Sequence, residues 1–517
     1  MRSRPWRSCV SDPLGPNRIV NYRPLLFAAL GLAGGILLFE ELRRVTGATA
    51  LFYGLLIVLE AGAVTCAVLL KPKPLKLLAV FVAIGMARTL IAVPFAVCEG
   101  EADVVGTVEG VSETKEGVVT LRRVYVDGER FNAKVRLTLT AGNTPAIGDT
   151  IAARASVREP SIRFGTYDER LIFLADGVGC AAKAGEYRLL GSGALPILKL
   201  SNDARRFLLS RSEEIFGSSS GIVSGFLFGA KQGVDEADTE SFRATGTAHL
   251  LSLSGFHVAL LTYVIFLLVP KRAPRARFAF GCAFLLFYCF IAGFSPSIVR
   301  AGVACACALL AAVLERRPDP LSALSASAIL ILLVSPYKLY SVGFELSYAA
   351  TLGILFMVST GFRRRGIGGK LLSDMLVTFG ATAATLLISA RYFGTVCVYS
   401  LVANIAAVPI FSAAIVLSFI LMLIGIPFPG AAAVLSFIPN TLTEASLSLL
   451  RIIESIPYSV IGVGRPSAIS IVLMLLILFF ASGYVLRPPK RKLAICGSLL
   501  VVFAASCAAD VLFYGSF

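Results

Sequence analysis

The chain has 517 residues, of which 56% are hydrophobic and 15% are charged, and its formal net charge is +16. Soluble proteins are usually about 45–50% apolar with about 25% charged residues, so this composition excludes a soluble globular protein and indicates an integral membrane protein. Its apolar runs reach the roughly 20 residues of a membrane-spanning helix and lack the alternation of an outer-membrane barrel. Most of the positive charge lies in short clusters between these runs, which favours a role in membrane orientation over nucleic-acid binding.

The N-terminal region predicts a basic tail at 1–24 and three transmembrane helices within 25–98. The helices are expected at about 25–39, 50–70 and 75–97. No small-residue cleavage site precedes a soluble domain, so the first apolar run is expected to be an anchor rather than a signal peptide. Lys71, Lys73 and Lys76 follow the second run. Placing these lysines and the basic tail inside the cell puts residue 98 outside.

The long polar region at 99–190 predicts a β domain on the extracytoplasmic side. Its strands are expected at 104–111, 118–126, 130–140, 150–158 and 179–189, with a partly helical insertion at 168–175. Five short strands with one insertion are typical of a small barrel of the OB type. The charge of this domain is nearly balanced and its aromatic residues are few, so a structural or docking role is as well supported as nucleic-acid binding. Cys98 and Cys180 flank it and are a candidate disulfide if the compartment is oxidising.

The rest of the chain predicts a larger membrane domain. Residues 191–248 are expected to form surface helices, amphipathic at 197–217, and a second amphipathic segment is expected at 440–456. Within the membrane domain at 249–490, spans are expected at about 249–269, 278–294, 298–314, 321–336, 340–360, 371–390, 396–410, 411–427 and 467–486. Residues 491–517 add a last helix, at 493–513, and a short C-terminus outside. The breaks at Pro409 and Pro427 leave open whether 396–427 forms re-entrant half-helices.

This arrangement places the basic loops at 270–277, 315–318, 363–370 and 487–492 on the inner side together, as the positive-inside rule requires. The agreement of four loops supports the predicted topology.

Both histidines of the chain lie in one short segment at the start of a predicted span. On a continuous helix, His249 and His257 would lie about 80° apart around the axis and about 12 Å apart along it. Ser252, Ser254 and Gly255 stand between them. Polar groups in lipid usually face a cavity, a partner or a transport path, so this segment is the first candidate for a functional site.

Few other polar side chains lie within or at the ends of the predicted spans. They are Ser295, Ser297, Arg300, Glu345, Arg391 and Asn404. The arginines can be explained as interfacial residues and the serines as partners of the backbone. Glu345 is harder to explain in this way, because a buried carboxylate needs a proton or a cation. Arg300 and Arg391 are candidate partners for it on the same side of the membrane.

Enzymatic and metal-binding functions find little support in the sequence. Ser254 and Gly255 lack the Gly-x-Ser-x-Gly context of a nucleophile, and the sequence has no Walker A motif. The two histidines could hold a metal only with ligands from elsewhere, and no Cys/His spacing indicates zinc. We therefore expect no catalytic residue, no cofactor and no metal.

Five segments resemble the ComEC family of competence proteins and occur in the order of that family. They are Gly246-Thr-Ala-His-Leu-Leu-Ser-Leu-Ser-Gly-Phe-His257, Gly293-Phe-Ser-Pro-Ser-Ile-Val-Arg-Ala301, Arg316-Arg-Pro-Asp-Pro320, Gly343-Phe-Glu-Leu-Ser-Tyr348 and Asn404-Ile-Ala-Ala-Val-Pro409. The family more often has Gln at Glu345 and Phe at Tyr348. In the outer domain, Ile147-Gly-Asp149 and Tyr167-Asp-Glu-Arg170 are similar to the barrel that precedes the channel in this family.

The resemblance implies an inner-membrane channel that moves single-stranded DNA into the cytoplasm during natural transformation. The polar residues named above, from His249 to Asn404, would line the DNA path. The resemblance implies a separate DNA receptor and a cytoplasmic motor, and it is compatible with a homo-oligomer in the lipid bilayer. Many members carry a C-terminal metallo-β-lactamase-like nuclease domain. With two histidines, this chain is expected to lack that domain's metal cluster, so a nuclease would be a separate chain.

Two other functions stay open at this point. A small-molecule or ion transporter would use Glu345 as a proton or cation site together with the His249–His257 helix, although the chain shows no strong internal repeats of the kind common in secondary transporters. A non-enzymatic membrane scaffold would instead bind a protein through its outer domain.

Overall fold

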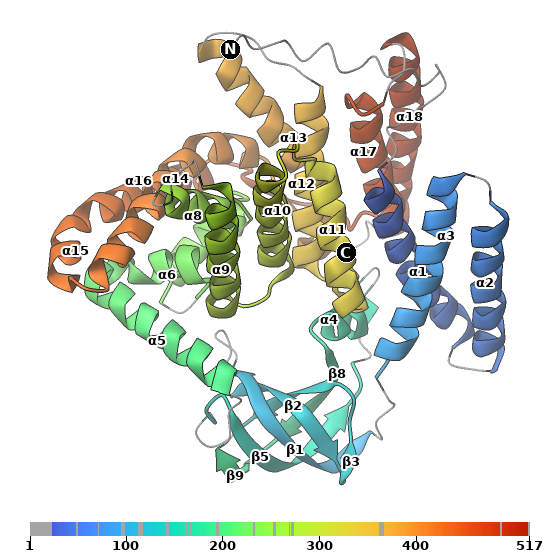
Figure 1. Cartoon of the computed structure of the whole chain (residues 1–517), viewed down its shortest axis with the longest axis horizontal. Coiled ribbons are helices and arrows are strands. Elements are labelled where there is room, and N and C mark those ends of the chain that lie inside the picture. The colour runs from blue at the N-terminus through green and yellow to red at the C-terminus, as the bar shows by residue number, and fades with distance from the viewer. Residues whose placement is uncertain are drawn as a thin grey trace.

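The computed structural model describes residues 23–47, 50–70, 72–94, 99–111, 117–140, 144–160, 163–164, 167–192, 196–230, 233–251, 255–267, 269, 273–360, 367–485 and 489–514. Most of these residues are helical, and one small β-barrel lies at an end of the helical part (Figure 1). Nine of the described helices are long and apolar enough to cross a membrane. The predicted combination of a polytopic helical protein with one small β domain is confirmed at this level.

Three helices open the described chain, as predicted: α1 (Pro24–Thr46), α2 (Ala50–Leu69) and α3 (Lys73–Ala92). Helix α1 packs against α3 through small residues, because Gly31 and Gly35 repeat on one face of α1. A Cβ atom added to Gly35 would overlap the carbonyl oxygen of Val82, and Gly35 faces Gly85 of α3. Small residues spaced in this way allow two membrane helices to approach closely.

The small β domain is a closed barrel of five strands. These are β1 (Gly100–Val111), β2 (Val118–Val126), β4 (Lys134–Leu139), β5 (Asp149–Arg158) and β8 (Val178–Ala184). Neighbours pair in the order β1, β2, β4, β8, β5, and β5 returns to β1. Only the β4–β8 pair in this ring is parallel. The alternation of buried and partly exposed residues along β4 and β8 follows from this closure, because one face of every strand fills the barrel.

The β domain also contains four short strands outside the ring of five. These are β3 (Glu129–Arg130), β6 (Arg163–Phe164), β7 (Tyr167–Asp168) and β9 (Arg188–Ser192). The strand predicted at 179–189 is divided into β8 and β9, which pair with different parts of β5. The predicted helical insertion is present as α4 (Glu169–Ala175), whose N-terminus is capped by the Asp168 side chain. Such a cap satisfies a backbone N–H that the first helical turn leaves unpaired.

Helix α4 fixes the barrel to the helical part. Arg170 of α4 forms an ion pair with Glu40 of α1, a carboxylate that is 6% exposed. The hydroxyl of Tyr337 donates a hydrogen bond of 2.8 Å to the other oxygen of Glu40. Lys338 reaches Asp176, just beyond α4, at 3.2 Å. Tyr337 and Lys338 belong to the short 3-10 helix η4 (Pro336–Tyr340), so α1, α4 and η4 meet at one junction.

Replacing Arg170 with alanine is expected to lower the free energy of unfolding by about 3–5 kcal/mol, because it leaves the buried Glu40 without its cation. Denaturant titration of the purified protein in detergent measures this change. Arg154→Ala is the matched control, since Arg154 pairs with Glu101 on the surface of the same barrel, where both side chains are mostly exposed. It is expected to cost no more than about 1 kcal/mol. Equal losses from the two variants would contradict a special role of the Glu40 junction.

The segment between the barrel and the main helices contains α5 (Pro196–Phe216), α6 (Ser220–Phe228) and α7 (Glu236–Ala244). Helix α5 has the amphipathic pattern predicted for 197–217. It packs along the helical part, where Ser201 and Arg205 donate hydrogen bonds to the carbonyl oxygens of Phe290 and Ile291. Helix α6 is buried over Gly221–Phe228, so it is a core element rather than the surface helix expected within 191–248.

The histidine segment differs from its prediction. His249 lies in a 3-10 turn, η3 (Ala248–Leu250), whereas His257 lies in helix α8 (Gly255–Leu267). The span predicted as one helix over 249–269 is therefore wrong, and the angle and rise derived for the two histidines do not apply. Glycine loses more conformational entropy than other residues when it enters a helix, so it is unfavourable in a helix interior. Gly255 is the first described residue of α8, where this cost matters less.

The remaining helices fill the centre of the molecule and extend to both of its sides, with α15 and α16 on one side and α17 and α18 on the other (Figure 1). They are α9 (Pro274–Ala292), α10 (Pro296–Val313), α11 (Pro320–Val334), α12 (Val342–Ser359), α13 (Ile367–Phe393), α14 (Ser400–Gly425), α15 (Pro429–Leu435), α16 (Phe437–Glu454), α17 (Ala468–Ala481) and α18 (Pro489–Tyr514). Proline at the first position of α9, α10 and α11 fits a helix start, where its missing N–H would have no partner in the helix.

The region at 396–427 also differs from its prediction of two short spans. Helix α14 continues through Pro409 to Gly425. Proline is tolerated inside a membrane helix when neighbouring helices compensate for the lost hydrogen bond, and α14 packs against α8, α13 and α16. The chain returns through α15 and α16, which are bent by 43° relative to each other. Strands β10 (Thr395–Cys397) and β11 (Val460–Gly462) pair antiparallel and bring the two ends of this hairpin together.

Helix α16 covers the segment predicted as an amphipathic surface helix at 440–456. It packs against α14, and its buried residues include Thr443, Ser446 and Leu450. Two polar contacts join it to α7: Arg451 pairs with Asp238, and the hydroxyl of Ser241 donates to Glu454. The amphipathic pattern therefore reflects contact with two neighbouring helices rather than with a membrane surface alone.

Candidate functional site

Five helices form a closed ring of contacts that carries most of the candidate residues. Helix α8 packs against α10, α10 against α12, α12 against α13, α13 against α14, and α14 against α8. Four of the five family-like segments lie on or beside this ring. These are 246–257, 293–301, 343–348 and 404–409. The fold thus brings together segments that are spread over residues 246 to 409 of the sequence.

Arg300 is the centre of the polar contacts in this ring. It lies in the first turns of α10 and is half-buried. Its Nε atom donates a hydrogen bond of 2.8 Å to the hydroxyl of Ser347 on α12. Its terminal nitrogen lies against Gly255 at the start of α8, where an added Cβ atom would overlap it. One guanidinium therefore links the histidine segment to the segment that contains Glu345 and Ser347.

Glu345 lies one turn from the start of α12 and faces α13. It accepts a hydrogen bond of 3.0 Å from the hydroxyl of Tyr392, which follows Arg391 in the last turn of α13. Glu345, Arg391 and Tyr392 are all half-buried. Tyr392 is thus the described hydrogen-bond partner of Glu345, and the charge of Arg391, one of its two predicted partners, acts on the same carboxyl.

The two histidines occupy different environments. His257 is 0% exposed, and its ring lies 6.3 Å from that of Phe226 on α6. Phe226 in turn packs edge-on against Phe411 of α14 at 5.3 Å. His249 is exposed and follows the buried Thr247. His257 thus belongs to the packed wall between α6, α8 and α14, and His249 precedes this wall in the turn η3.

A second close contact fixes the beginning of the histidine segment. Gly246 has a φ angle of +70°, which favours glycine, and an added Cβ atom would come within 2.8 Å of Ser400 and 3.2 Å of Cys397. The Cys397 thiol also contacts the carbonyl oxygen of Arg243 at 3.1 Å. The segment is therefore held at both ends, by α14 near Gly246 and by Arg300 near Gly255.

The other predicted residues have local roles or fall outside the description. Ser295 caps the N-terminus of α10 by accepting from the backbone N–H of Ile298, and Ser297 is half-buried in the first turn. The Asn404 side chain donates to the carbonyl oxygen of Ser400 in its own helix. Ser252 and Ser254 lie outside the described residues.

The third family-like segment, at 316–320, lies apart from the ring. Asp319 accepts a hydrogen bond of 2.8 Å from the Nε atom of Arg23, at the start of α1, and another from Ser322. Burial opposes ionisation of this carboxyl, but these hydrogen bonds outweigh it and lower the pKa of Asp319. The segment therefore joins α11 to α1 rather than contributing to the candidate site.

The candidate disulfide is not resolved by the structure. Cys98 lies outside the described residues. Cys180 is a buried free thiol in β8, and burial raises its pKa to about 12. The pairing stays a prediction. Among the residues with described positions, no group of three or more His, Cys, Asp or Glu side chains could hold a metal ion.

Apolar spanning helices, an appended small barrel and a ring of helices with internal polar contacts define the class of the chain, a multi-pass membrane protein. The chain belongs to the family described as Competence protein, whose profile matches residues 226–488, more than half of its length. The matched region contains the whole five-helix ring.

Three curated proteins show the range of similarity. ComE operon protein 3 of Bacillus subtilis is 28% identical over 199 residues, which cover 38% of this chain and 25% of that protein. Recombination protein 2 of Haemophilus influenzae is 26% identical over 229 residues, 42% of this chain and 28% of that protein. Competence protein ComA of Neisseria gonorrhoeae is 26% identical over 260 residues, 46% of this chain and 36% of that protein. The alignments thus span about a quarter to a third of these relatives. No solved structure matches the chain.

Two residues of the site escaped the sequence reasoning. Ser347 lies within a recognised segment, but its partner Arg300 is 47 residues away. Tyr392 directly follows Arg391, and a buried aromatic hydroxyl usually finds a hydrogen-bond partner, which is the signal that could have identified it. Neither pairing can be read from spacing, because each joins two different helices.

Proposed function

We propose that this chain is the membrane channel component that moves single-stranded DNA across the plasma membrane during natural transformation. The observation that carries the proposal is the convergence of four family-like segments on one ring of helices in a member of the Competence protein family. Arg300 supports this function chemically, because a guanidinium is suited to phosphate groups. Its contact with Ser347 would orient this charge within the helices.

The proposed path lies between α8, α10, α12, α13 and α14. His249, Gly255, Arg300, Glu345, Arg391 and Asn404 belong to it, with Ser252, Ser254, His257, Ser295 and Ser297 beside them. We propose that this chain conducts the DNA strand and that separate proteins capture the DNA, degrade the other strand and supply the driving force. A homo-oligomer would be compatible with this path.

The proposed orientation places the basic N-terminus inside the cell and the barrel and C-terminus outside. Two ion pairs support it, because they lie at opposite ends of α1. Arg23, at the start of α1, pairs with Asp319 beside a basic loop, and Glu40, near its end, pairs with Arg170 of the barrel. Positive loops favour the cytoplasmic side.

The barrel is proposed to be of the OB type. Its five strands form a closed antiparallel ring with one parallel pair, β4–β8. OB folds are five-stranded Greek-key barrels. The ion pair between Arg170 of α4 and Glu40 of α1 supports a role of the barrel in docking on the outer end of the helices.

The proposal is tested by deleting the gene in a transformable host and measuring uptake of labelled DNA together with transformation frequency. Both are expected to be lost and to return when the gene is supplied on a plasmid. Normal uptake and transformation in the deletion strain would contradict the proposal. The scaffold alternative predicts that the purified chain forms no pore in reconstituted vesicles.

Glu345→Gln separates the channel from a transporter that uses Glu345 as a proton or cation site. A glutamine can still accept the hydrogen bond from Tyr392, so DNA uptake is expected to change less than about threefold. Uptake assays with equal amounts of membrane protein measure this. The transporter alternative predicts complete loss of its transport, since glutamine cannot take up a proton or pair with a cation. Abolished DNA uptake in this variant would favour an ionisable role for Glu345.

A further inference from the structure

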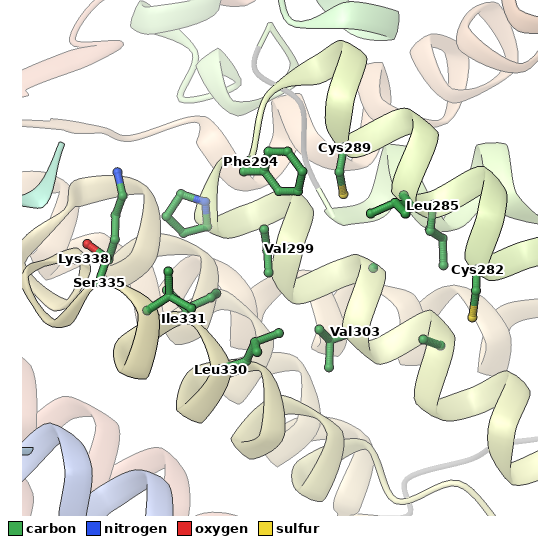
Figure 2. Close-up of a pocket in the computed structure, with 15 residues that line it drawn as sticks. Cys282, Leu285, Cys289, Phe294, Val299, Val303, Leu330, Ile331, Ser335 and Lys338 are labelled. Atoms are coloured by element: carbon green, nitrogen blue, oxygen red, sulfur yellow. The ribbon is translucent and has the colours of Figure 1, made fainter. Parts of the chain in front are cut away.

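An apolar groove opens between α9, α10 and α11, away from the described contacts of the five-helix ring. Its volume is about 510 Å³. Figure 2 shows Val299 and Val303 of α10 between Leu285 of α9 and Leu330 of α11. Ser335 and Lys338 lie at one end of the groove and Cys282 at the other (Figure 2). The groove has the size of a small-molecule site, about 300–1,000 Å³.

The groove exists because α10 has small side chains along it. Gly302 and Ala306 lie one turn apart and both line the groove. A Cβ atom added to Gly302 would have no heavy atom within 4 Å, so this glycine leaves open space rather than allowing a close helix contact. That distinguishes it from Gly353 on α12, where the next helix fills the space.

The chemistry of the lining changes along the groove. Its walls are hydrocarbon, and Leu286, Phe294 and Leu330 are about half exposed in the isolated chain. Bilayer hydrocarbon is the expected surrounding of such side chains in a spanning helix. At the polar end, the ammonium of Lys338 completes the lining.

The polar end carries an excess of positive charge. Lys338 and Arg136 of the barrel share one carboxylate, that of Asp176. Arg88 of α3 donates to the carbonyl oxygens of Leu333 and Val334 at the end of α11. The nearby pair of Arg170 and Glu40 is balanced. An anionic group would therefore complement the cations at this end, and a phosphate accepts charge-assisted hydrogen bonds from such cations.

We propose that the groove binds one acyl chain of an anionic phospholipid, with the lipid phosphate beside Lys338 at the junction between helices and barrel. The uninterrupted apolar length fits a hydrocarbon chain, and the charge at one end fits a phosphate headgroup. The lipid would connect α9, α10 and α11 with the barrel through Lys338 and Asp176. This binding site is independent of the DNA-conducting function.

The test uses the full chain purified in detergent and native mass spectrometry with added 1-palmitoyl-2-oleoyl-phosphatidylglycerol or the matching phosphatidylcholine. One phosphatidylglycerol is expected to stay bound at detergent concentrations that remove the others. Gly302→Leu fills the groove, and retention is expected to fall about tenfold. Gly62→Leu is the matched control, because Gly62 of α2 also faces open space but lies outside the groove. It is expected to retain the lipid.

Lys338→Gln tests the headgroup. It is expected to remove the preference for phosphatidylglycerol over phosphatidylcholine while leaving acyl-chain binding. A phosphatidylglycerol with a diazirine in its acyl chain is expected to crosslink to peptides of α9, α10 and α11. Unchanged retention in Gly302→Leu, or crosslinks confined to other helices, would overturn the proposal. A dimer that replaces lipid in the spectra and is lost in Gly302→Leu would assign the groove to a second copy instead.

Discussion

Gly255→Ala is expected to reduce DNA uptake at least about tenfold while leaving the amount of protein in the membrane unchanged. The added methyl group would overlap the terminal nitrogen of Arg300, so the guanidinium must move. Because the far end of an arginine is flexible, the fold can accommodate this shift at low cost. The displaced guanidinium would no longer keep its bond to Ser347. Uptake of labelled DNA and quantitative blotting of membranes measure the two effects separately.

Two comparisons isolate the role of Arg300 in this result. Gly368→Ala is the matched control, since Gly368 also lies at the start of a helix, α13, and faces open space. The double variant Gly255→Ala with Arg300→Gln is expected to be no worse than Arg300→Gln alone, because both changes act on one contact. Additive losses, or normal uptake in Gly255→Ala, would show that the contact between Gly255 and Arg300 has no part in conduction.

The sequence predicts the elements of this protein better than their contacts. Apolar runs locate the three N-terminal helices, and alternating residues locate the strands of the barrel, since both patterns depend on local periodicity. Closure of the barrel through the β1–β5 pair and the junction of Arg170 with Glu40 depend on long-range contacts. Residues 170 and 40 come from different domains, so no spacing rule relates them.

The errors of prediction have a common physical cause, which is that local sequence alone was used to decide where a helix continues and where it breaks. The segment from His249 to Leu267 is apolar enough for one span, but His249 lies in a 3-10 turn and not in the α-helix that contains His257. At Pro409 the reverse holds, because tertiary packing keeps α14 continuous through a residue that usually breaks helices. In both places, contacts with other helices decide the result.

A substitution in the helix pair that carries Glu345 and Tyr392 is expected to have a large effect on stability. In Gly353→Leu, the new side chain would overlap the carbonyl oxygen of Gly380 on α13 and approach Ala384. These are backbone and short side-chain atoms that cannot rotate away, so α12 and α13 must separate. Overpacking of this kind costs typically about 1–3 kcal/mol, and we expect a value at or above the upper end. Unfolding of the purified protein in mixed detergent micelles measures it.

Gly343→Leu is the control, because Gly343 lies on the same helix and faces open space. It is expected to leave stability within about 0.5 kcal/mol of the unchanged protein. Gly353→Leu should also abolish DNA uptake, since separating the helices would break the bond from Tyr392 to Glu345. A variant Gly353→Leu with normal stability would contradict the close packing of α12 on α13. Normal stability of Tyr392→Phe together with impaired uptake would place the effect on the site itself, because that change removes the hydroxyl and leaves the helix contact intact.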